Sequence, residues 1–338
     1  MNKQGDVASP FLKERDPELS ILKEISAVAS ISMPIGETWT VSRCRYRSDD
    51  GAGKRLCLAT GIHGDEMMGQ LVVYSVAKRI MAEPQHLHGT VDIYPMLNAM
   101  GLDIGERHVP ASTRLDMNRA FPGAENGTAL ESMCFHILRD MSGADLVIDV
   151  HASTLQKSEL YQVRLHETTA GAMMQDALDL APQLIWVIPD KAAFNATLTG
   201  ALNDAGTPAL VIEADERRRS AYDTTYPVIE GIFCKMKAMG MWTGETAVVP
   251  ASGDVPVVRD EENLCRVTCA RPGMYVPESC HGLEVSAGQK LGVIIDALRG
   301  EMIEEVLSPV DGLVFSQRSY SVVYPGTELV RLCRKERA

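Results

Sequence analysis

Short apolar runs recur between residues 41 and 245, each bounded by polar residues, glycine or proline. Five of them have the length and flanks of buried strands: residues 55–60, 90–95, 145–150, 184–188 and 208–213. Between the runs, residues 66–81 and 128–141 place their apolar positions on one helical face. Thr128 and Glu131 form a capping-box pattern at the start of the second helix. This alternation predicts an α/β fold, with helices covering both faces of a mixed, largely parallel sheet.

The pattern changes after residue 245. From residue 250 to 338 the apolar segments shorten, helical periodicity fades, and turns with glycine or proline recur in RPGMYVP, SAGQKLGVII, LSPVDGLVFS and VYPGTELVRL. Turn signals at this spacing predict a small all-β domain at the C-terminal end. Residues 1–40 carry mixed charges and no sharp motif, so we treat them as an N-terminal extension and residues 41–245 as the main domain.

Composition and charge exclude several classes of function. The 338 residues include 45 acidic and 33 basic side chains, a net charge of −12, and no Lys/Arg-rich run stands out. This balance disfavours nucleic acid and anionic membranes as partners. Apolar stretches fall short of the roughly 18 residues of a membrane span, and the first residues lack the apolar core of a signal peptide. With sparse cysteines inside apolar runs, we expect a cytoplasmic protein, and a homo-oligomer is compatible with the sequence.

Three side chains suggest a metal centre. His63 and Glu66 lie three residues apart, directly after a predicted strand and at the opening of a helix, so one turn brings both to the same side. His151 follows another buried run and supplies a third ligand at a strand end. Two imidazoles and a carboxylate form the ligand type of hydrolytic zinc sites, with a fourth position left for water.

A hydrolytic site also needs a base that does not bind the metal. Glu213 ends the buried run PALVIE in the same strand-end position, and strand alternation places Asp215 on the same side. We choose Glu213 as the general base. Asp149, two residues before His151, either accepts the ring proton of a ligand histidine or caps the strand.

A polar loop between the ligand pairs is rich in arginine. It contains Arg107, Arg114, Asn118 and Arg119 next to Phe121. A guanidinium can bind a substrate carboxylate with two parallel hydrogen bonds, and a second donor can stabilise an oxyanion. Alternatively, Arg114 and Arg119 pair with Asp116 on the surface, where such bridges contribute roughly 0 to 1 kcal/mol.

The motifs GIHGDE, DMNRAFPG, IDVHAS and VIEAD, in this order, resemble the succinylglutamate desuccinylase/aspartoacylase family, which is related to the zinc carboxypeptidases. The similarity covers roughly residues 40–245, and the series is more specific than any single motif. The resemblance implies one zinc ion per chain, held by His63, Glu66 and His151. It also implies roles for four other residues: a general base at Glu213, carboxylate binding by Asn118 and Arg119, and support of the carbonyl oxygen by Arg107, for which Arg114 is a competitor.

The C-terminal segment resembles the lipoyl/biotinyl-like β domain attached to many bacterial members of this family. It lacks the Met-Lys-Met hairpin of a carrier domain, and Lys290 stands in GQKLG instead. The resemblance therefore implies a structural or site-shaping domain without an attached cofactor. Members with this architecture include deacetylases of N-acetylated diamino acids such as N-acetyl-diaminobutyrate, which makes small N-acyl amino acids the expected substrates.

Three functions follow from these features, and the sequence ranks them without excluding any. The first is a zinc-dependent hydrolase that cleaves the amide bond of a small N-acyl amino acid. The second is a metallocarboxypeptidase or cell-wall peptide hydrolase, which would use the same metal chemistry in a wider cleft. The third is a non-catalytic ligand-binding protein that retains a metal site.

Overall fold

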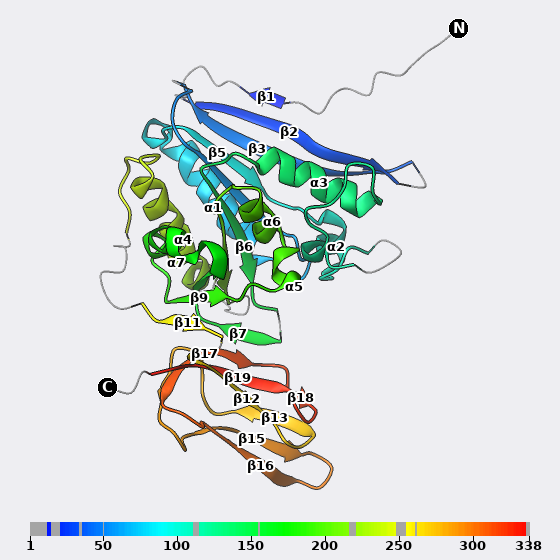
Figure 1. Ribbon diagram of the computed structural model, residues 1–338, viewed down its shortest axis with the longest axis vertical. Coiled ribbons are helices and arrows are strands. Elements are labelled where there is room, and N and C mark those ends of the chain that lie inside the picture. Colours follow the sequence, from blue (N-terminus) through cyan, green and yellow to red (C-terminus); the bar gives the residue numbers. More distant parts are fainter. Residues whose placement is uncertain are drawn as a thin grey trace.

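The computed structural model describes residues 12–14, 21–33, 36–49, 51–110, 115–154, 156–215, 221–247, 255–260 and 262–335. A ten-stranded sheet forms the centre of the larger part of the molecule (Figure 1). Its strands, in spatial order, are β1 (Leu12–Glu14), β2 (Ile21–Ser32), β3 (Thr38–Ser48), β5 (Thr90–Tyr94), β4 (Arg55–Thr60), β6 (Leu146–Ala152), β10 (Ala209–Ala214), β8 (Gln162–His166), β9 (Leu184–Ile188) and β11 (Val257–Arg259).

The middle of this sheet is parallel. β5, β4, β6 and β10 pair in parallel, as do β8, β9 and β11, whereas β10 with β8 and the pairs from β1 to β5 are antiparallel. The five predicted strands correspond to β4, β5, β6, β9 and β10, so the mixed, largely parallel α/β fold is confirmed. Parallel neighbours end at the same edge of the sheet, which places the ends of β4, β6 and β10 side by side.

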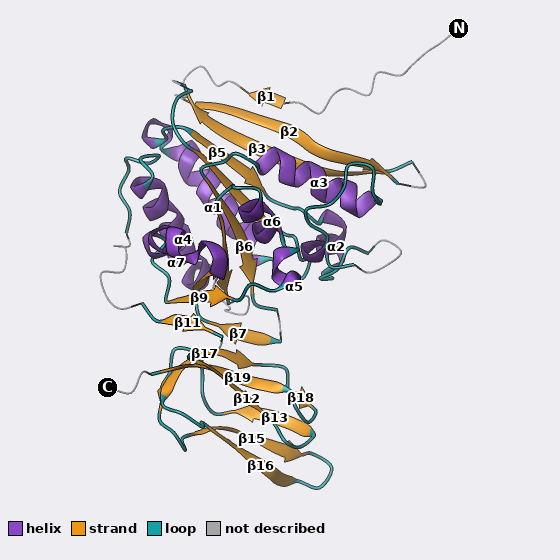
Figure 2. Cartoon of the chain, in the orientation of Figure 1, coloured by secondary structure: helices purple, strands orange, loops and turns teal. Residues whose placement is uncertain are grey.

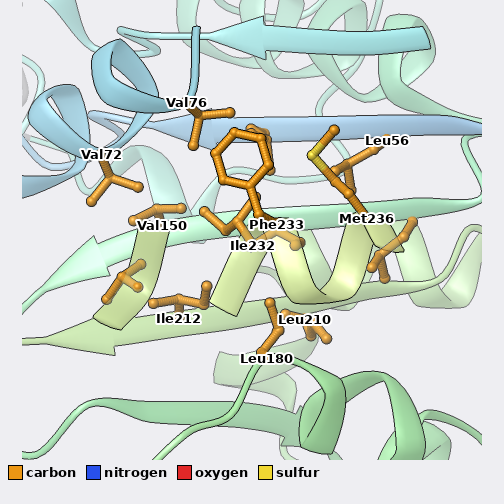
Figure 3. Packing of buried hydrophobic residues seen from close by; sticks show 14 of the residues in the cluster. Leu56, Val72, Val76, Val150, Leu180, Leu210, Ile212, Ile232, Phe233 and Met236 are labelled. Carbon is orange, nitrogen blue, oxygen red and sulfur yellow. The ribbon is translucent and has the colours of Figure 1, made fainter. Parts of the chain in front are cut away.

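Helices cover both faces of the sheet (Figure 2). On one face, α1 (Met68–Ala82), α4 (Glu167–Asp179) and α7 (Ala221–Ala238) bury their apolar sides against the strands. Figure 3 shows Val72 and Val76 of α1 above Phe233 and Ile232 of α7 in this layer. On the other face, α3 (Ala129–Met141) and α6 (Leu198–Asp204) contribute to a second core.

Short helices complete the connections: α2 (Ala99–Ile104), α5 (Ala192–Asn195), η1 (Pro84–His86) and η2 (Met117–Arg119). At the start of α3, the Thr128 side chain accepts a hydrogen bond from the Glu131 amide, and the Glu131 carboxylate accepts one from the Thr128 amide. The predicted capping box is thereby confirmed. None of the described helices combines the length and apolar character needed to cross a bilayer.

Residues 21–32, for which the sequence offered no role, form β2 of the large sheet, and their antiparallel partner is β3. Buried side chains of this hairpin, among them Val41 and Trp39, belong to the core beneath α3. The ten-stranded sheet therefore begins before residue 41.

The C-terminal part is all β, as predicted, and contains two antiparallel sheets around one core. One sheet pairs β12 (Leu264–Thr268), β19 (Glu328–Arg334), β17 (Gly312–Arg318) and β14 (Glu284–Val285). The other pairs β16 (Glu301–Leu307), β15 (Lys290–Asp296), β13 (Gly273–Pro277) and β18 (Val322–Val323).

A strand from the larger part joins the first of these sheets. After β6 the chain leaves the large sheet, forms β7 (Lys157–Glu159) against β17, and returns as β8 (Figure 1). At this junction Leu160 and Trp186 share an apolar cluster with Phe315 and Leu264 from the C-terminal β domain. The two parts are therefore joined by the pairing of β7 with β17 and by a shared core.

Candidate metal centre

The loop after β4 presents His63 and Glu66. Gly64 between them packs so closely on α2 that a Cβ atom there would lie 2.1 Å from the carbonyl carbon of Gly101. Glycine is therefore required at this position, because real Cβ atoms do not approach backbone atoms so closely. The tight packing fixes the direction in which the two polar side chains leave the loop.

His63, Glu66 and His151 converge on one point, and their ligand atoms all lie within 4.8 Å of one another. Nδ1 of His63 lies 2.7 Å from Glu66 Oε1, and Nδ1 of His151 lies 2.9 Å from Glu66 Oε2. All three side chains are buried. The amide of Ala152 donates to Glu66 Oε2 at 3.1 Å, which orients the carboxylate. The structure thus brings together the three residues predicted as ligands.

A carboxylate holds the outer nitrogen of each imidazole. His63 Nε2 lies 3.2 Å from Asp116 Oδ1, and His151 Nε2 lies 2.9 Å from Asp149 Oδ2. This is the arrangement in which a ligand histidine donates its second ring proton to a carboxylate, leaving Nδ1 to face a metal. Of the two roles considered for Asp149, the structure supports the one in which its carboxylate accepts the ring proton of His151.

Electrostatics at the three residues favour positive charge. Burial alone would lower the pKa of His151, but the negative charges of Asp149 and Glu66 outweigh it and raise the pKa well above its usual value. Burial would likewise raise the pKa of Glu66, yet the interactions with His151 and His63 hold it far below its usual range. The potential that favours an imidazolium also favours a divalent cation. With two nitrogen donors and one oxygen donor, the residues fit an ion such as zinc.

Glu213 lies beside the three residues. It is the register partner of His151 across the parallel β6–β10 pair, so both side chains project from the same face of the sheet. Burial raises the pKa of the Glu213 carboxyl from 4.5 to about 7, although Arg164 and His151 act in the opposite direction. Nη1 of Arg164 lies 2.8 Å from Glu213 Oε1. The predicted base therefore lines the same cavity as the predicted ligands.

Arg107 contacts the ligand group directly. Its Nη1 donates to Glu66 Oε1 at 3.1 Å, and its Nη2 donates to Asp116 Oδ2 at 3.3 Å. Within the described part of the chain, Asp116 forms its ion pairs with Arg107 and His63, so the surface pairing considered for Arg119 is not observed. Arg114, the competing arginine, lies outside the described residues.

Asn118 and Arg119 also line the cavity, from the short helix η2. The Asn118 carbonyl oxygen Oδ1 accepts a hydrogen bond of 2.8 Å from the Leu198 amide, and its Nδ2 lies 3.5 Å from His151 Nε2. Nη1 of Arg119 donates to the main-chain oxygen of Asn118. The hydrogen bond from the Leu198 amide fixes the Asn118 side chain against the start of α6. The guanidinium of Arg119 forms part of the cavity wall.

The cavity has a volume of about 410 Å³ and is lined by all of the described predicted site residues. Sequence reasoning missed a second group of charged residues in its wall: Lys157, Glu159, Arg164 and Arg331. Arg164 lies on β8, two strands away from the strand of His151. The alternation of side chains in QVRLH was the sequence signal that could have predicted which face of the sheet Arg164 projects from. Arg331 belongs to the C-terminal β domain, and nothing in its local sequence points to the cavity.

Asp215, expected on the same side as Glu213, lines a different cavity. Its carboxylate accepts a hydrogen bond of 2.8 Å from the Ser158 hydroxyl, and Nε2 of His281 lies 4.0 Å away. β10 ends at Ala214, so strand alternation no longer governs the next side chain. Asp215 is therefore excluded from the metal centre.

The profile of the succinylglutamate desuccinylase/aspartoacylase catalytic domain matches residues 52–228. The chain belongs to this family. The matched segment includes all three predicted ligands as well as Asn118, Arg119 and Glu213, and it ends before the C-terminal β domain. None of the curated proteins matches the chain.

Solved structures of this desuccinylase/aspartoacylase type share the complete architecture. The crystal structure of a succinylglutamate desuccinylase/aspartoacylase from Rhodobacter sphaeroides is 21% identical, with a TM-score of 0.74, and the match covers 97% of this chain and 100% of that one. The product-bound ectoine utilization protein EutE (DoeB) from Ruegeria pomeroyi is 19% identical, with a TM-score of 0.77 and the same coverage. At these identities the likeness concerns the fold, including the C-terminal β domain.

Proposed function

We propose that this member of the desuccinylase/aspartoacylase family is a zinc-dependent hydrolase that removes the acyl group from a small N-acyl amino acid. One observation carries the proposal. His63, Glu66 and His151 direct three ligand atoms at one point, in a cavity that also contains the partly buried carboxylate of Glu213. Ligands and a neighbouring base are the two elements that metal-assisted hydrolysis requires.

A divalent ion bound by the three ligands would polarise the amide carbonyl and acidify a water molecule. Glu213 would accept the proton of that water and return it to the nitrogen of the leaving amine. Burial favours this exchange because it raises the pKa of the Glu213 carboxyl above its usual value, and a pKa closer to neutrality lets the group both accept and release a proton more readily.

Arg107 would stabilise the negative charge that develops on the carbonyl oxygen. Its guanidinium lies beside Glu66 and Asp116, so it is anchored next to the ligands before substrate arrives. A donor that is already oriented needs no reorganisation as the charge forms.

Asn118 and Arg119 would bind the carboxylate of the amino acid. A guanidinium and an amide together offer several parallel N–H donors, which match the geometry of a carboxylate. Fixing the carboxylate holds the scissile bond at a constant distance from the ligands.

The size of the cavity supports a small substrate over a peptide. A volume of about 410 Å³ accommodates a small molecule, and Arg331 of the C-terminal β domain forms part of the cavity wall. The eight cysteines are free thiols, which supports a reducing compartment such as the cytoplasm.

The direct test loads the purified protein with zinc and measures release of acetate, succinate or another acid from a panel of N-acyl amino acids. We expect one equivalent of bound metal and turnover of at least one member of the panel. Turnover of dipeptides instead would assign a carboxypeptidase, and zinc binding without any turnover would assign a ligand-binding protein.

The variant Glu213→Gln tests the base. We expect it to retain stoichiometric zinc and to lose about 10²- to 10⁴-fold in kcat, because the amide cannot accept the proton. Glu262→Gln, at an exposed position in the C-terminal part, serves as the control and is expected to match the wild type. Unchanged turnover in Glu213→Gln would remove Glu213 from the mechanism.

A further inference from the structure

Among the described residues of the C-terminal β domain, Arg331 of β19 lines the cavity of the candidate metal centre. Nη1 of Arg331 lies 3.5 Å from Oε1 of Glu159, and Nε donates to Glu328 Oε1 at 2.8 Å. The guanidinium is thus held on its own strand by Glu328 while it faces a carboxylate of the neighbouring strand β7.

Glu159 connects the two parts of the molecule. It belongs to β7, which pairs with β17 in a register that sets Glu159 opposite Ser316. The Ser316 hydroxyl donates to Glu159 Oε1 at 2.8 Å, and the whole residue is only 4% exposed. A carboxylate so deeply buried needs its charged partners, because an unpaired buried charge is strongly destabilising.

The second oxygen of Glu159 faces the catalytic domain. Nη2 of Arg164 lies 3.4 Å from Glu159 Oε2, and Nη1 of the same guanidinium lies 2.8 Å from Glu213 Oε1. Arg164 therefore bridges Glu159 and the proposed base. The contacts form a continuous sequence from Arg331 through Glu159 and Arg164 to Glu213, which we call the charge chain.

Trp186 of β9 supports both guanidiniums of the charge chain. Its ring centroid lies 4.9 Å from the Arg164 Cζ atom and 5.1 Å from the Arg331 Cζ atom. The indole Nε1 donates to Asp260 at 2.8 Å, which fixes the orientation of the ring. Stacking on an aromatic face restricts the rotamers of both arginines and holds the chain in one arrangement.

We propose that Arg331, Glu159 and Arg164 are positioning residues for Glu213, so that the C-terminal β domain orients the base of a site built on the other domain. This inference rests on the proposed function of Glu213. Arg164 engages Oε1 of the Glu213 carboxylate, and the proton is exchanged at Oε2. Loss of Arg331 leaves Glu159 short of a cation, Glu159 then draws Arg164 toward itself, and the base rotates away from the ligands.

The kinetic test compares Arg331→Met and Arg331→Lys with the wild type in the zinc-loaded, full-length protein. We expect Arg331→Met to lower kcat about tenfold and to leave KM within about twofold, because small errors in geometry mainly affect proton transfer. Arg331→Lys, which keeps the charge, is expected to recover part of the loss. Arg299→Met is the control and is expected to match the wild type, since Arg299 is an exposed arginine of the same domain that pairs with Asp296 and does not line the cavity.

A double-mutant cycle separates positioning from direct binding of substrate. If Arg331 acts through Glu159, the variant Glu159→Gln is itself impaired, and adding Arg331→Met to it changes kcat by less than about twofold. A rise in KM at constant kcat, with the full effect of Arg331→Met retained in the Glu159→Gln background, would overturn the proposal and assign Arg331 to the substrate.

A structural readout keeps this inference separate from the proposed hydrolase activity. Crystal structures of the wild type and Arg331→Met are compared at the Arg164–Glu213 pair, together with the zinc content of each protein. We expect the variant to retain zinc and to lose or lengthen the 2.8 Å contact. An unchanged contact in a folded variant would overturn the positioning role, whatever substrate the enzyme turns over.

Discussion

At the scale of single residues, the candidate centre is defined by carboxylates on both sides of each imidazole. Glu66 faces Nδ1 of His63 and His151, while Asp116 and Asp149 face the opposite nitrogens. The inner carboxylate of Glu66 would bind the same cation as the two imidazoles, whereas the outer carboxylates fix the tautomer and the plane of each ring. Metal affinity should therefore depend on aspartates that do not touch the metal.

The variant Asp149→Asn tests this dependence. We expect zinc affinity to fall about 10- to 100-fold, because an amide orients the ring less strongly and removes a negative charge from a fully buried position. Competition with a chromophoric chelator measures the affinity without reference to activity. Asp103→Asn, at an exposed position in α2, is the control, and equal affinities in both variants would contradict the role of Asp149.

The raised pKa of Glu213 predicts the acidic side of the pH profile. The base works only when deprotonated, so activity is complete above the pKa and is lost as pH falls through it. Burial raises this pKa to about 7 in the metal-free protein, and a bound dication would lower it toward the usual 4.5. We expect the acidic limb of kcat/KM to have its midpoint between these values. If the acidic midpoint of kcat/KM does not lie above the usual carboxyl pKa of 4.5, burial does not govern the pKa of Glu213.

At the scale of elements, the ligand-bearing loop after β4 depends on glycine. Gly64 has its Cα so close to Gly101 of α2 that even a methyl group cannot be placed there. The turn that directs His63 and Glu66 is therefore coupled to a helix that carries no predicted site residue.

We expect Gly64→Ala to displace this loop and to reduce bound zinc well below one equivalent, while the far-ultraviolet circular dichroism stays close to that of the wild type. Metal analysis after gel filtration measures the occupancy. Gly171→Ala in α4, where a Cβ atom meets nothing within 4 Å, is the control. Full zinc occupancy in Gly64→Ala would show that the loop tolerates the displacement.

Much of the sheet could be predicted from the sequence, because buried parallel strands are continuous apolar runs that stand out between amphipathic helices. RLCLAT and PALVIE locate β4 and β10 to within one residue, and the strand-end positions of His151 and Glu213 follow from them. The hairpin of β2 and β3 was not predicted, because apolar and polar residues alternate only weakly along its strands. Charged residues such as Arg43 and Arg45 interrupt the pattern.

The missed part of the site has a different origin. Arg164 and Arg331 reach the cavity through tertiary pairing of β8 with β10 and of β7 with β17. Such contacts join residues far apart in the chain, and no local periodicity encodes them. The ligands and Glu213 were identifiable because their side chains lie at strand ends, whereas Arg164 depends on a strand pairing within the large sheet and Arg331 on how the two parts dock.

At the scale of the whole molecule, the two parts share a core at their junction. Phe315 of β17 is fully buried in a cluster with Leu160, Leu184 and Trp186 from the larger part. Because this cluster belongs to both parts, loosening of one exposes apolar surface of the other. The molecule should therefore unfold in a single transition although it consists of two parts.

The variant Phe315→Ala tests this coupling. We expect the free energy of unfolding to fall by about 3 to 5 kcal/mol, as for other fully buried phenylalanines. Tryptophan fluorescence, which reports Trp39, Trp186 and Trp242 of the larger part, and circular dichroism should shift together. Leu298→Ala, 91% exposed in the C-terminal β domain, is expected to change stability by less than about 0.5 kcal/mol. Two separate transitions would contradict the shared core.

Strand β7 limits how this architecture can be divided. It lies in the chain between the strand that carries His151 and the strand that carries Glu213, yet its hydrogen-bonding partner is β17. Removal of the C-terminal β domain would deprive β7 of its partner strand and would expose the apolar surface at the junction. An unpaired strand edge and an exposed apolar patch both promote aggregation. Recombination of such enzymes should therefore succeed when the C-terminal module is exchanged together with the β6–β8 excursion, and fail when the module is transplanted alone.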